Sequence, residues 1–424
     1  MEAPDPRLHR RSIAVAALST VVEWYDFTLY LYFSTVLARV FFGPGEASLV
    51  ATLGGFAVAY LMRPVGALVF GHVGDRHGRR PMLLLSMAVM SLAMLLTGLL
   101  PTQAQIGPLA AWLLILLRCV MGFSVGGEYT GVVAYLLESA PRARRGLVAS
   151  LAAASSEIGA LLAVAVSALT VSSMSNADLE SWGWRIPFLV GAALAGAVWL
   201  ARSTMKESPD FERQRSEGSI PRAPILQALS KQRAGVARGF AISALGSITY
   251  YVGITYVPAF LASTGSATES ESLWLSTLAA VAVIAVTPAI GLLSDRIGRK
   301  PVLIAFAALS ALLPIAMFSL MAGGSIGQAL FGAVVLALVA GGVSAVGAVA
   351  TAEQFTGEAR ISGLALGATI ATAIFGGLTP WLAQILIDGT GRNQIPGVMI
   401  AIVALCVVPV FLTMRETRPE PTEA

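Results

Sequence analysis

The sequence predicts an all-α membrane protein with 12 transmembrane helices arranged as two six-helix halves. Its composition points to a membrane protein first. Hydrophobic residues make up 56% of the 424-residue chain and charged residues only 12%, whereas a soluble domain carries about 25% charged residues. The mean hydropathy of +0.76 over so long a chain is typical of a protein that crosses the bilayer many times.

The second observation is a ladder of apolar runs. A spanning helix needs about 20 mostly apolar residues, and the chain offers 12 runs of this kind. They lie at 12–41, 47–71, 82–101, 108–135, 147–171, 185–202, 236–262, 272–293, 301–322, 326–350, 363–387 and 396–414. Gly and Pro interrupt several of them, which transmembrane helices tolerate.

The basic residues orient this ladder in the membrane. All but five of the 28 Lys and Arg residues fall in the two termini and in alternate loops, on one side of the ladder. The exceptions are Arg39, Arg185 and Arg392 on the other side, and Arg63 and Arg118 within runs. Cytoplasmic loops carry the excess of Lys and Arg, so both termini are expected in the cytoplasm. Basic clusters beside spans are topology signals, and we expect no nucleic-acid partner.

The third observation is an internal repeat. Positions 71–81 read GHVGDRHGRRP and positions 291–301 read GLLSDRIGRKP, at an offset of 220 residues. A glutamate seven residues before an arginine also recurs, at 138 and 145 and again at 353 and 360. Such parallel repeats are typical of transporters. We therefore expect an N-terminal half (1–202), a polar cytoplasmic linker (203–234) and a C-terminal half (235–424).

The G-x-x-x-D-R-x-G-R-R loop resembles the signature of the major facilitator superfamily. Further segments resemble its metabolite:proton symporter family: EWYDF (23–27), LMRPVGALVFGHVGDRHGRRP (61–81), RCVMGFSVGGEYTG (118–131), WGWRIPF (182–188), KESPDF (206–211) and IFGGLTP (374–380). The resemblance implies uptake of proline and betaine, 2-oxoglutarate, citrate, tricarballylate, shikimate or a similar solute with protons. GFSVGGEYTG and TYYVGITYVPAFL (249–261) resemble the proline/betaine branch, while EWYDF and IFGGLTP resemble the carboxylate branches, so the branch stays open.

Ionisable residues inside the spans are candidate functional groups, because a charge at the bilayer centre costs at least about 2.5–3.5 kcal/mol. Glu23, Asp26 and Tyr30 share one face of the first helix, at i, i+3 and i+7. Arg63 and Arg118 are the cations that face such acids or a solute carboxylate. The alternatives are structural hydrogen bonds for the acids and a helix-capping or assembly role for Arg63.

Two further glutamates extend this list. Glu128 lies in GGEYTG, where the glycines permit close helix approach, and it can pair with an Arg or take part in transport. Glu157 occupies a position that the family patterns do not mark as acidic. It is a proton site, a group that faces a partly cationic substrate, or a glutamate that faces the cytoplasmic vestibule with no special role. The proton is expected on Glu23, Asp26, Glu128 or Glu157, because an apolar cavity favours the protonated acid and a nearby Arg opposes it. The resemblance associates Arg118, which opens an R-x-x-x-G pattern, with proton coupling.

Aromatic residues of the first and seventh spans give a weaker indication. Tyr25 with Trp24, and Tyr250 and Tyr251 with Tyr256, can form a cage for a quaternary ammonium. The alternative is packing or anchoring at the membrane interface.

The repeated loops are interpreted as gates. Asp75 can accept backbone N–H groups at a helix N-terminus, and basic residues can pair with a glutamate at the end of the fourth or tenth span. Such a lock would stabilise the outward-open state. The expected gating residues are Gly71, Asp75, Arg79, Glu138 and Arg145 in the first half, and Asp295, Arg299, Glu353 and Arg360 in the second.

The sequence therefore predicts a secondary active transporter. It would import a small carboxylate-bearing or zwitterionic solute with protons by alternating access, as a monomer in the bilayer of the bacterial cytoplasmic (inner) membrane. The alternative is a proton-coupled efflux antiporter of a small metabolite or drug, although the fifth run lacks the proline that drug antiporters carry there. With only three His residues, the chain lacks the groups for hydrolytic or metal chemistry. We expect no enzyme activity, no cofactor and no metal, with the proton gradient as the driving force.

Overall fold

A computed structural model describes residues 20–77, 79–126, 145–203, 216–217, 233–354 and 367–417. Within these ranges, the side chains at 46, 71–72, 74–76, 79, 145–154 and 352 are outside the description. The predicted linker, 203–234, is described only at positions 203, 216–217 and 233–234.

The first half of the described chain is entirely helical apart from its turns. Helical residues 20–32, here called the first helix, come before all labelled elements. They are followed by α2 (Ser34–Leu37), the π-helical turn η1 (Ala38–Phe42), α3 (Glu46–His77), α4 (Arg79–Gly98), α5 (Gln103–Ile106), α6 (Leu109–Val125), α8 (Arg145–Ser173), α9 (Asn176–Asp178), η3 (Leu179–Gly183) and α10 (Arg185–Ser203).

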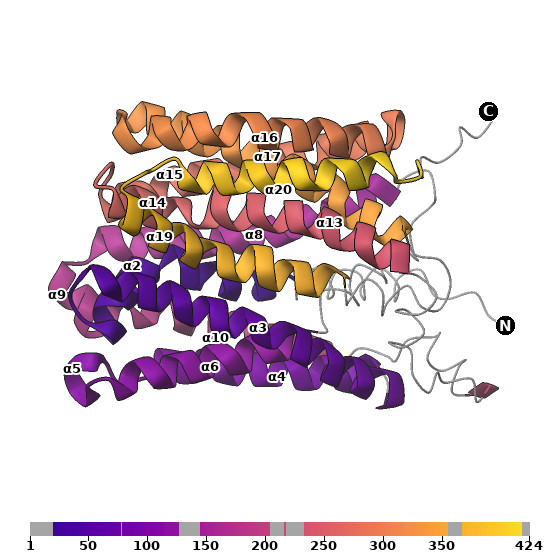
Figure 1. Cartoon of the computed structure of the whole chain (residues 1–424). Coiled ribbons are helices and arrows are strands. Elements are labelled where there is room, and N and C mark those ends of the chain that lie inside the picture. Colours follow the sequence, from indigo (N-terminus) through magenta and orange to yellow (C-terminus); the bar gives the residue numbers. More distant parts are fainter. Residues whose placement is uncertain are drawn as a thin grey trace.

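The second half repeats this pattern of long helices and short turns. Its elements are α13 (Arg233–Tyr250), η4 (Tyr251–Thr255), α14 (Val257–Ser263), α15 (Glu269–Ile297), α16 (Arg299–Gly323), α17 (Ile326–Glu353), η6 (Ala373–Leu378), α19 (Thr379–Thr390) and α20 (Ile395–Leu412). The long helices lie side by side along one common direction, with the short helices α5 and α9 together at one end (Figure 1). We call this the α9 end, and we call the other end, where α16 begins, the gate end.

Nine helices of the described chain are long and apolar enough to cross a membrane. They are Ala47–Phe70, Arg80–Gly98, Ser155–Ser173, Asn176–Ser203, Glu269–Ile297, Arg299–Gly323, Ile326–Thr351, Gly367–Thr390 and Ile395–Leu412. A tenth forms if Arg233–Thr255 and Val257–Ser263, bent by 44°, are one span. The first helix and the shorter Leu109–Val125 overlap the two remaining predicted runs, so the count of 12 stays a prediction.

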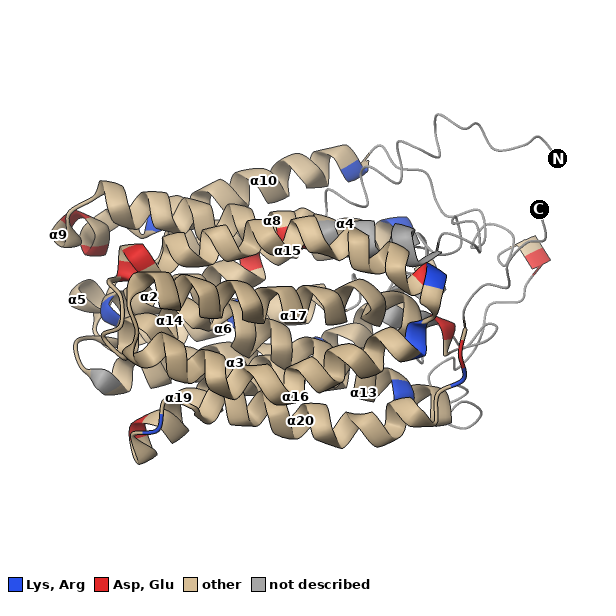
Figure 2. Cartoon of the chain, turned by 90° about the horizontal axis from the view of Figure 1, so that it is seen from above, with Lys and Arg blue, Asp and Glu red and all other residues tan. Residues whose placement is uncertain are grey.

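The outer surface is apolar where a soluble protein would be polar. Leu312 is 73% exposed and Trp112 69% exposed, and many other large apolar side chains also face outward. Most of the charged residues drawn in red and blue lie at the two ends of the bundle (Figure 2). Lipid acyl chains are the solvent that matches an apolar belt between two charged ends. The molecule is therefore a multi-pass membrane protein.

The second DRxGRKP loop forms a sharp junction between two helices. Helix α15 starts at a capping box, in which Thr268 and Glu271 satisfy each other's backbone amides. It ends at Gly298, whose φ of +112° suits glycine and few other residues. Helix α16 starts at the next residue. This tight turn brings the charged side chains of the loop together at the gate end.

Close helix packing positions the interior of the first half. A Cβ atom on Gly66 of α3 would overlap the carbonyl of Phe123 in α6, and one on Gly126 would overlap the carbonyl of Arg63. Only glycine permits so close an approach of two backbones. Between the halves, α8 packs against α15 and α17, and α3 packs against η6 and α19. These contacts bring α3 and α8 against the second half, and Trp24 of the first helix also contacts Tyr250 of α13.

Candidate functional site

The acidic face of the first helix points inward, as its spacing predicts. Glu23, Asp26 and Tyr30 are all buried. The Asp26 Oδ1 atom lies 3.1 Å from Nη1 of Arg118 on α6, and the two side chains are 1% and 4% exposed. Because a buried charge is costly without an opposite charge, this pair explains how both groups are accommodated in the interior.

Only one of the two Asp26 carboxylate oxygens takes part in this ion pair. The Oδ2 atom is buried and accepts no hydrogen bond from the residues that the structure describes. Arg118 also donates to Thr97 Oγ1 over 3.4 Å and approaches the Met121 Sδ over 2.6 Å. A carboxylate with one free, buried oxygen beside a permanent cation is a group on which a proton can be taken up and released.

Arg63 has a different environment from Arg118. It is 9% exposed, and its Cζ lies 3.6 Å from the ring centroid of Phe27 and 4.3 Å from that of Tyr60. Among the residues that the structure describes, no carboxylate lies within 4.0 Å of its guanidinium, and its Nε atom has no hydrogen-bond partner. Arg63 is therefore a buried cation whose closest described contacts are aromatic faces, and a guanidinium of this kind can bind an anion.

Aromatic rings from both halves gather beside Arg63. Trp24 contacts Tyr250 edge to face with centroids 5.0 Å apart, and Tyr250 contacts Tyr251 in the same way at 5.3 Å. The hydroxyls of Tyr60 and Tyr251 form a hydrogen bond between the halves. The rings pack on one another, and Arg63 already covers the face of Phe27.

Glu157 lies on α8 and is buried. Its carboxylate interacts electrostatically with the hydroxyls of Tyr32 on the first helix and Tyr250 on α13. Among the described residues, no Lys or Arg lies within 4.0 Å of it. The interior thus holds two ionisable side chains without an ion-pair partner in the described chain, Arg63 and Glu157.

Two of the predicted tyrosines bond to the protein backbone. The Tyr25 hydroxyl donates to the carbonyl of Pro187 over 2.7 Å, and the Tyr30 hydroxyl donates to the carbonyl of Thr52 over 3.0 Å. Both hydroxyls fix the first helix to its neighbours in the same half. Their described contacts are those of packing residues.

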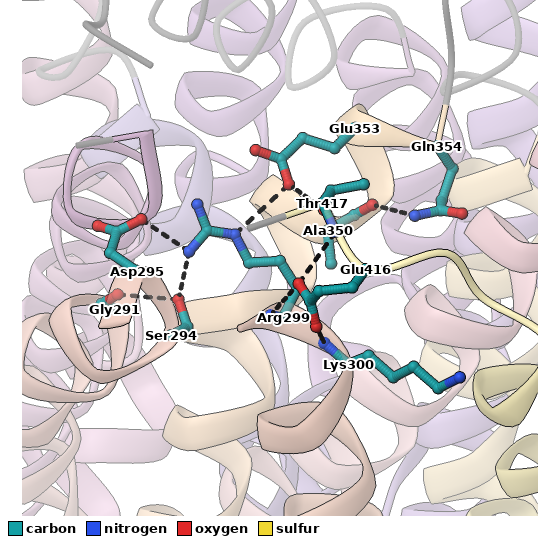
Figure 3. Close-up of polar contacts among 10 residues, drawn as sticks. All are labelled: Gly291, Ser294, Asp295, Arg299, Lys300, Ala350, Glu353, Gln354, Glu416 and Thr417. Carbon is teal, nitrogen blue, oxygen red and sulfur yellow. Dashed lines mark hydrogen bonds and ion pairs between the residues drawn. The ribbon is translucent and has the colours of Figure 1, made fainter. Parts of the chain in front are cut away.

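The second-half gating residues come together at the gate end. Arg299 is almost fully buried, and its Nη1 lies 2.7 Å from Asp295 Oδ1, while its Nε lies 3.4 Å from Glu353 Oε2 (Figure 3). The sequence correctly predicts that these three side chains meet, and Arg360 lies outside the described residues.

The structure adds one contact at the gate end that the sequence did not predict. Beside the pair of Asp295 and Arg299, a carboxylate caps the start of α16. The carboxylate that accepts the first amides of α16 belongs to Glu416 in the C-terminal tail, at 2.8 Å from Arg299 N and 3.1 Å from Lys300 N. Thr417 next to it donates to Glu353 (Figure 3). The carboxylate of Glu416 is close enough because α20 returns the chain to the gate end.

The side chains of several other predicted site residues lie outside the description. The backbones at Gly71 and Asp75 belong to α3, that at Arg79 to α4 and that at Arg145 to α8, but their side chains are outside the description. Glu128 and Glu138 lie outside the described residues altogether.

The sequence interpretation missed two features, one in the interior and one at the α9 end. Phe27 and Tyr60 hold Arg63, and the spacing of Tyr60 and Arg63, three residues apart on one helix, was the available signal. At the α9 end, Arg39 bonds both Glu180 and Glu269.

Among the described residues, no three His, Cys, Asp or Glu side chains lie together as metal ligands would.

The fold is that of a known class of transporters. The partially occluded, inward-open structure of the xylose transporter XylE from Escherichia coli superposes with a TM-score of 0.77 at 19% identity, over 98% of this chain and 99% of that one. Residues 12–219 match the family model described as sugar (and other) transporter, and residues 240–424 match that of the major facilitator superfamily.

Curated relatives resolve the family further. The ectoine/proline transporter ProP of Corynebacterium glutamicum is 33% identical, over 98% of this chain and 86% of the relative. The alpha-ketoglutarate permease of Escherichia coli is 34% identical, over 90% and 88%. The citrate-proton symporter of Klebsiella pneumoniae is 30% identical, over 91% and 87%. The chain belongs to the major facilitator superfamily and, within it, to the metabolite:proton symporter family; these relatives are transporters and not enzymes.

Proposed function

We propose that this protein imports a small carboxylate-bearing or zwitterionic solute together with protons, by alternating access across the bacterial inner membrane. The observation that carries the proposal is Arg63, a buried guanidinium that lacks a carboxylate partner among the described residues. A rigid guanidinium fork matches a solute carboxylate in two parallel hydrogen bonds, and it keeps its charge throughout transport.

We assign the proton to Asp26 because its protonation would break an ion pair between two helices, although the neighbouring Arg118 opposes that protonation. Protonation of Asp26 would weaken its ion pair with Arg118, and deprotonation would restore it. Since the pair joins the first helix to α6, the two protonation states favour different packing of these helices. Proton coupling then requires only that Asp26 is exposed to each side of the membrane in turn.

Glu157 favours a zwitterion over a dicarboxylate. A protonated amine or imine on the solute can form an ion pair with the Glu157 carboxylate, whereas a second carboxylate would need a proton between the two groups. Tyr32 and Tyr250 beside Glu157 offer further acceptors for such a group. Among the relatives, ectoine/proline and proline/betaine transporters are named for solutes of this kind.

The remaining parts of the proposal concern topology and assembly. We propose 12 spans, a division into halves 1–202 and 235–424 joined by the linker 203–234, and both termini in the cytoplasm. The apolar runs, the repeated loops and the distribution of Lys and Arg support this arrangement. We propose a monomer that uses the proton gradient and no cofactor.

The proposal is tested by uptake into proteoliposomes with an imposed proton gradient, acidic outside. Proline, betaine, 2-oxoglutarate and citrate are supplied in turn, with gradient-free vesicles as the control. We expect accumulation of at least one solute that collapses when a protonophore is added. If none is accumulated while another compound flows outward against its gradient, the protein is an efflux antiporter and the proposal is wrong.

A further inference from the structure

Tyr60 is shared between the proposed solute site and the opposite half of the protein. Its ring lies beneath the Arg63 guanidinium, with 4.3 Å between the ring centroid and Cζ. Its hydroxyl is hydrogen-bonded to Tyr251 of η4, in the second half. Tyr60 is 1% exposed, so both contacts are made in the interior. A single side chain therefore touches the candidate solute-binding cation and the other half at the same time.

Two glycines of the second half pack directly against the two tyrosines. A Cβ atom on Gly377 of η6 would overlap Tyr60, and a Cβ atom on Gly376 would overlap the ring of Tyr251. These glycines belong to the IFGGLTP segment (374–380). These two neighbouring glycines thus pack against the hydrogen-bonded pair, which has one tyrosine from each half. Because the packing is close, the two hydroxyls meet in this way only in one relative position of the halves.

We propose that Tyr60 is a positioning residue through which occupancy of Arg63 is coupled to the contact between the halves. The inference rests on the proposed function and adds the contact that transmits solute binding. An arriving carboxylate draws the guanidinium toward itself and away from the ring of Tyr60. The ring and its hydroxyl shift with it, so solute binding changes the stability of the Tyr60–Tyr251 contact. A ligand that interacts differently with two states shifts their equilibrium.

The test separates the ring of Tyr60 from its hydroxyl. Tyr60→Phe keeps the ring under Arg63 and removes the bond to Tyr251, whereas Tyr60→Leu removes both. Tyr256→Phe is the matched control, because this buried hydroxyl donates to Gln384 over 2.6 Å within the second half. Thermal unfolding in detergent checks that all variants fold.

Uptake kinetics in proteoliposomes give the readout. Tyr60→Phe should lower Vmax about fivefold with KM within about twofold of wild type, a change of the size of one net hydrogen bond. Tyr60→Leu should also raise KM about tenfold, because the cation–π contact that holds Arg63 is lost. Tyr251→Phe should match Tyr60→Phe. The double variant should be no worse than either single one, because both hydroxyls serve one bond.

Additive losses in the double variant, or equal losses in Tyr256→Phe, would overturn the proposed coupling. Unchanged Vmax in Tyr60→Phe would overturn it as well. These outcomes presuppose wild-type transport. Wild-type vesicles that take up no solute at all would instead refute the proposed function.

A second inference comes from an independent ion-pair network at the α9 end. Arg39 of η1 donates from Nε to Glu180 of η3 over 2.7 Å, in its own half. It also donates from Nη1 and Nη2 to the two carboxylate oxygens of Glu269, at 3.3 and 3.0 Å, in the second half. Thr35 donates to the same Glu269 carboxylate. Arg39 is 37% exposed and Glu269 19%, so the fork is partly shielded from solvent.

The geometry points to a clasp that holds the two halves together at the α9 end. This end is the one opposite the Arg299 cluster, and alternating access requires that closure at the two ends alternates. A fork-shaped bond between the first turn of α15 and η1 must break when the α9 end opens. Partly exposed ion pairs are individually weak, which suits a contact that opens in every cycle.

Spin-label distances test this clasp without knowledge of the solute. Labels are placed at Ser172 in α8 and Arg392 after α19, which are exposed residues of different halves, after Cys119 and Cys406 are replaced by Ser. Arg39→Glu should lengthen or broaden the distance distribution, because two like charges then face Glu269. Arg39→Glu combined with Glu269→Arg should restore the short distance. The control Arg185→Gln, which removes contacts within one half, should leave it unchanged.

The clasp is refuted if Arg39→Glu leaves the distance distribution as in wild type. It is also refuted if the charge swap fails to restore the short distance while the doubly substituted protein folds normally. Because the measurement needs no transport, it stands or falls separately from the proposed function.

Discussion

Arg63 and Arg118 are both buried arginines of the first half, but only the replacement of Arg118 by glutamine should lower stability clearly. Arg118 is paired with Asp26 at 3.1 Å, while Arg63 rests on two aromatic rings. Removing Arg118 leaves the Asp26 charge buried and unpaired, which costs about 3–5 kcal/mol. Removing Arg63 exposes no such partner among the described carboxylates.

The expected magnitude for Arg63→Gln follows from two opposing effects. The lost cation–π contacts contributed about 2 kcal/mol when desolvated. The relieved cost of an intramembrane cation is at least about 2.5 kcal/mol. These effects nearly cancel, so the unfolding midpoint of Arg63→Gln in detergent should lie close to that of wild type. The midpoint of Arg118→Gln should fall clearly.

Uptake, in contrast to stability, should depend strongly on Arg63. A solute carboxylate on Arg63 gains two charge-assisted hydrogen bonds, each worth about 1.5–3 kcal/mol. Arg63→Lys keeps the charge and loses the fork, so KM for uptake should rise by about 10- to 100-fold, the equivalent of one such bond. If Arg63→Gln unfolds as readily as Arg118→Gln, or if Arg63→Lys transports with wild-type KM, the assignment of Arg63 to the solute is wrong.

Further predictions concern other parts of the molecule. Glu157→Gln should raise KM for a zwitterionic solute and leave that for a dicarboxylate unchanged or lower; an equal effect on both in uptake assays would remove Glu157 from the site. Gly66→Ala should destabilise the protein by about 1–3 kcal/mol in thermal unfolding, because its methyl group overlaps the backbone of α6. Gly196→Ala, with space for a methyl group, is its control, and equal midpoints would contradict the packing account. Glu416→Gln should speed amide exchange at the start of α16, measured by hydrogen exchange and mass spectrometry, since its carboxylate accepts the amides there. Unchanged exchange would show that the tail does not protect this helix end.

The sequence was informative wherever the physical constraint is local. Apolar runs mark the spans because lipid demands about 20 apolar residues at a time, and the described helices follow those runs. The i, i+3 and i+7 spacing placed Glu23, Asp26 and Tyr30 on one inward face, and all three are buried. A repeated DRxGRKP loop predicted where Asp295 and Arg299 would meet, because both lie within one turn of the same junction.

Contacts between segments that lie far apart in the chain could not be predicted from the sequence. Nothing in the first helix indicates that Asp26 pairs with Arg118 and not with Arg63, because the choice depends on how α3 and α6 pack. The cap on α16 by Glu416 depends on where α20 returns the tail. The tyrosine pair between the halves depends on their relative position. In each case two segments more than 90 residues apart must first be placed in space.

The central claim is that the proton site at Asp26 and the solute site at Arg63 are separate. The most direct test compares two assays of Asp26→Asn in the same proteoliposomes: uptake driven by an imposed proton gradient, and counterflow of labelled solute against unlabelled solute inside. Asparagine keeps the shape of aspartate and cannot exchange a proton. The account predicts that gradient-driven accumulation is lost while counterflow persists. Accumulation at the wild-type level in Asp26→Asn would contradict it.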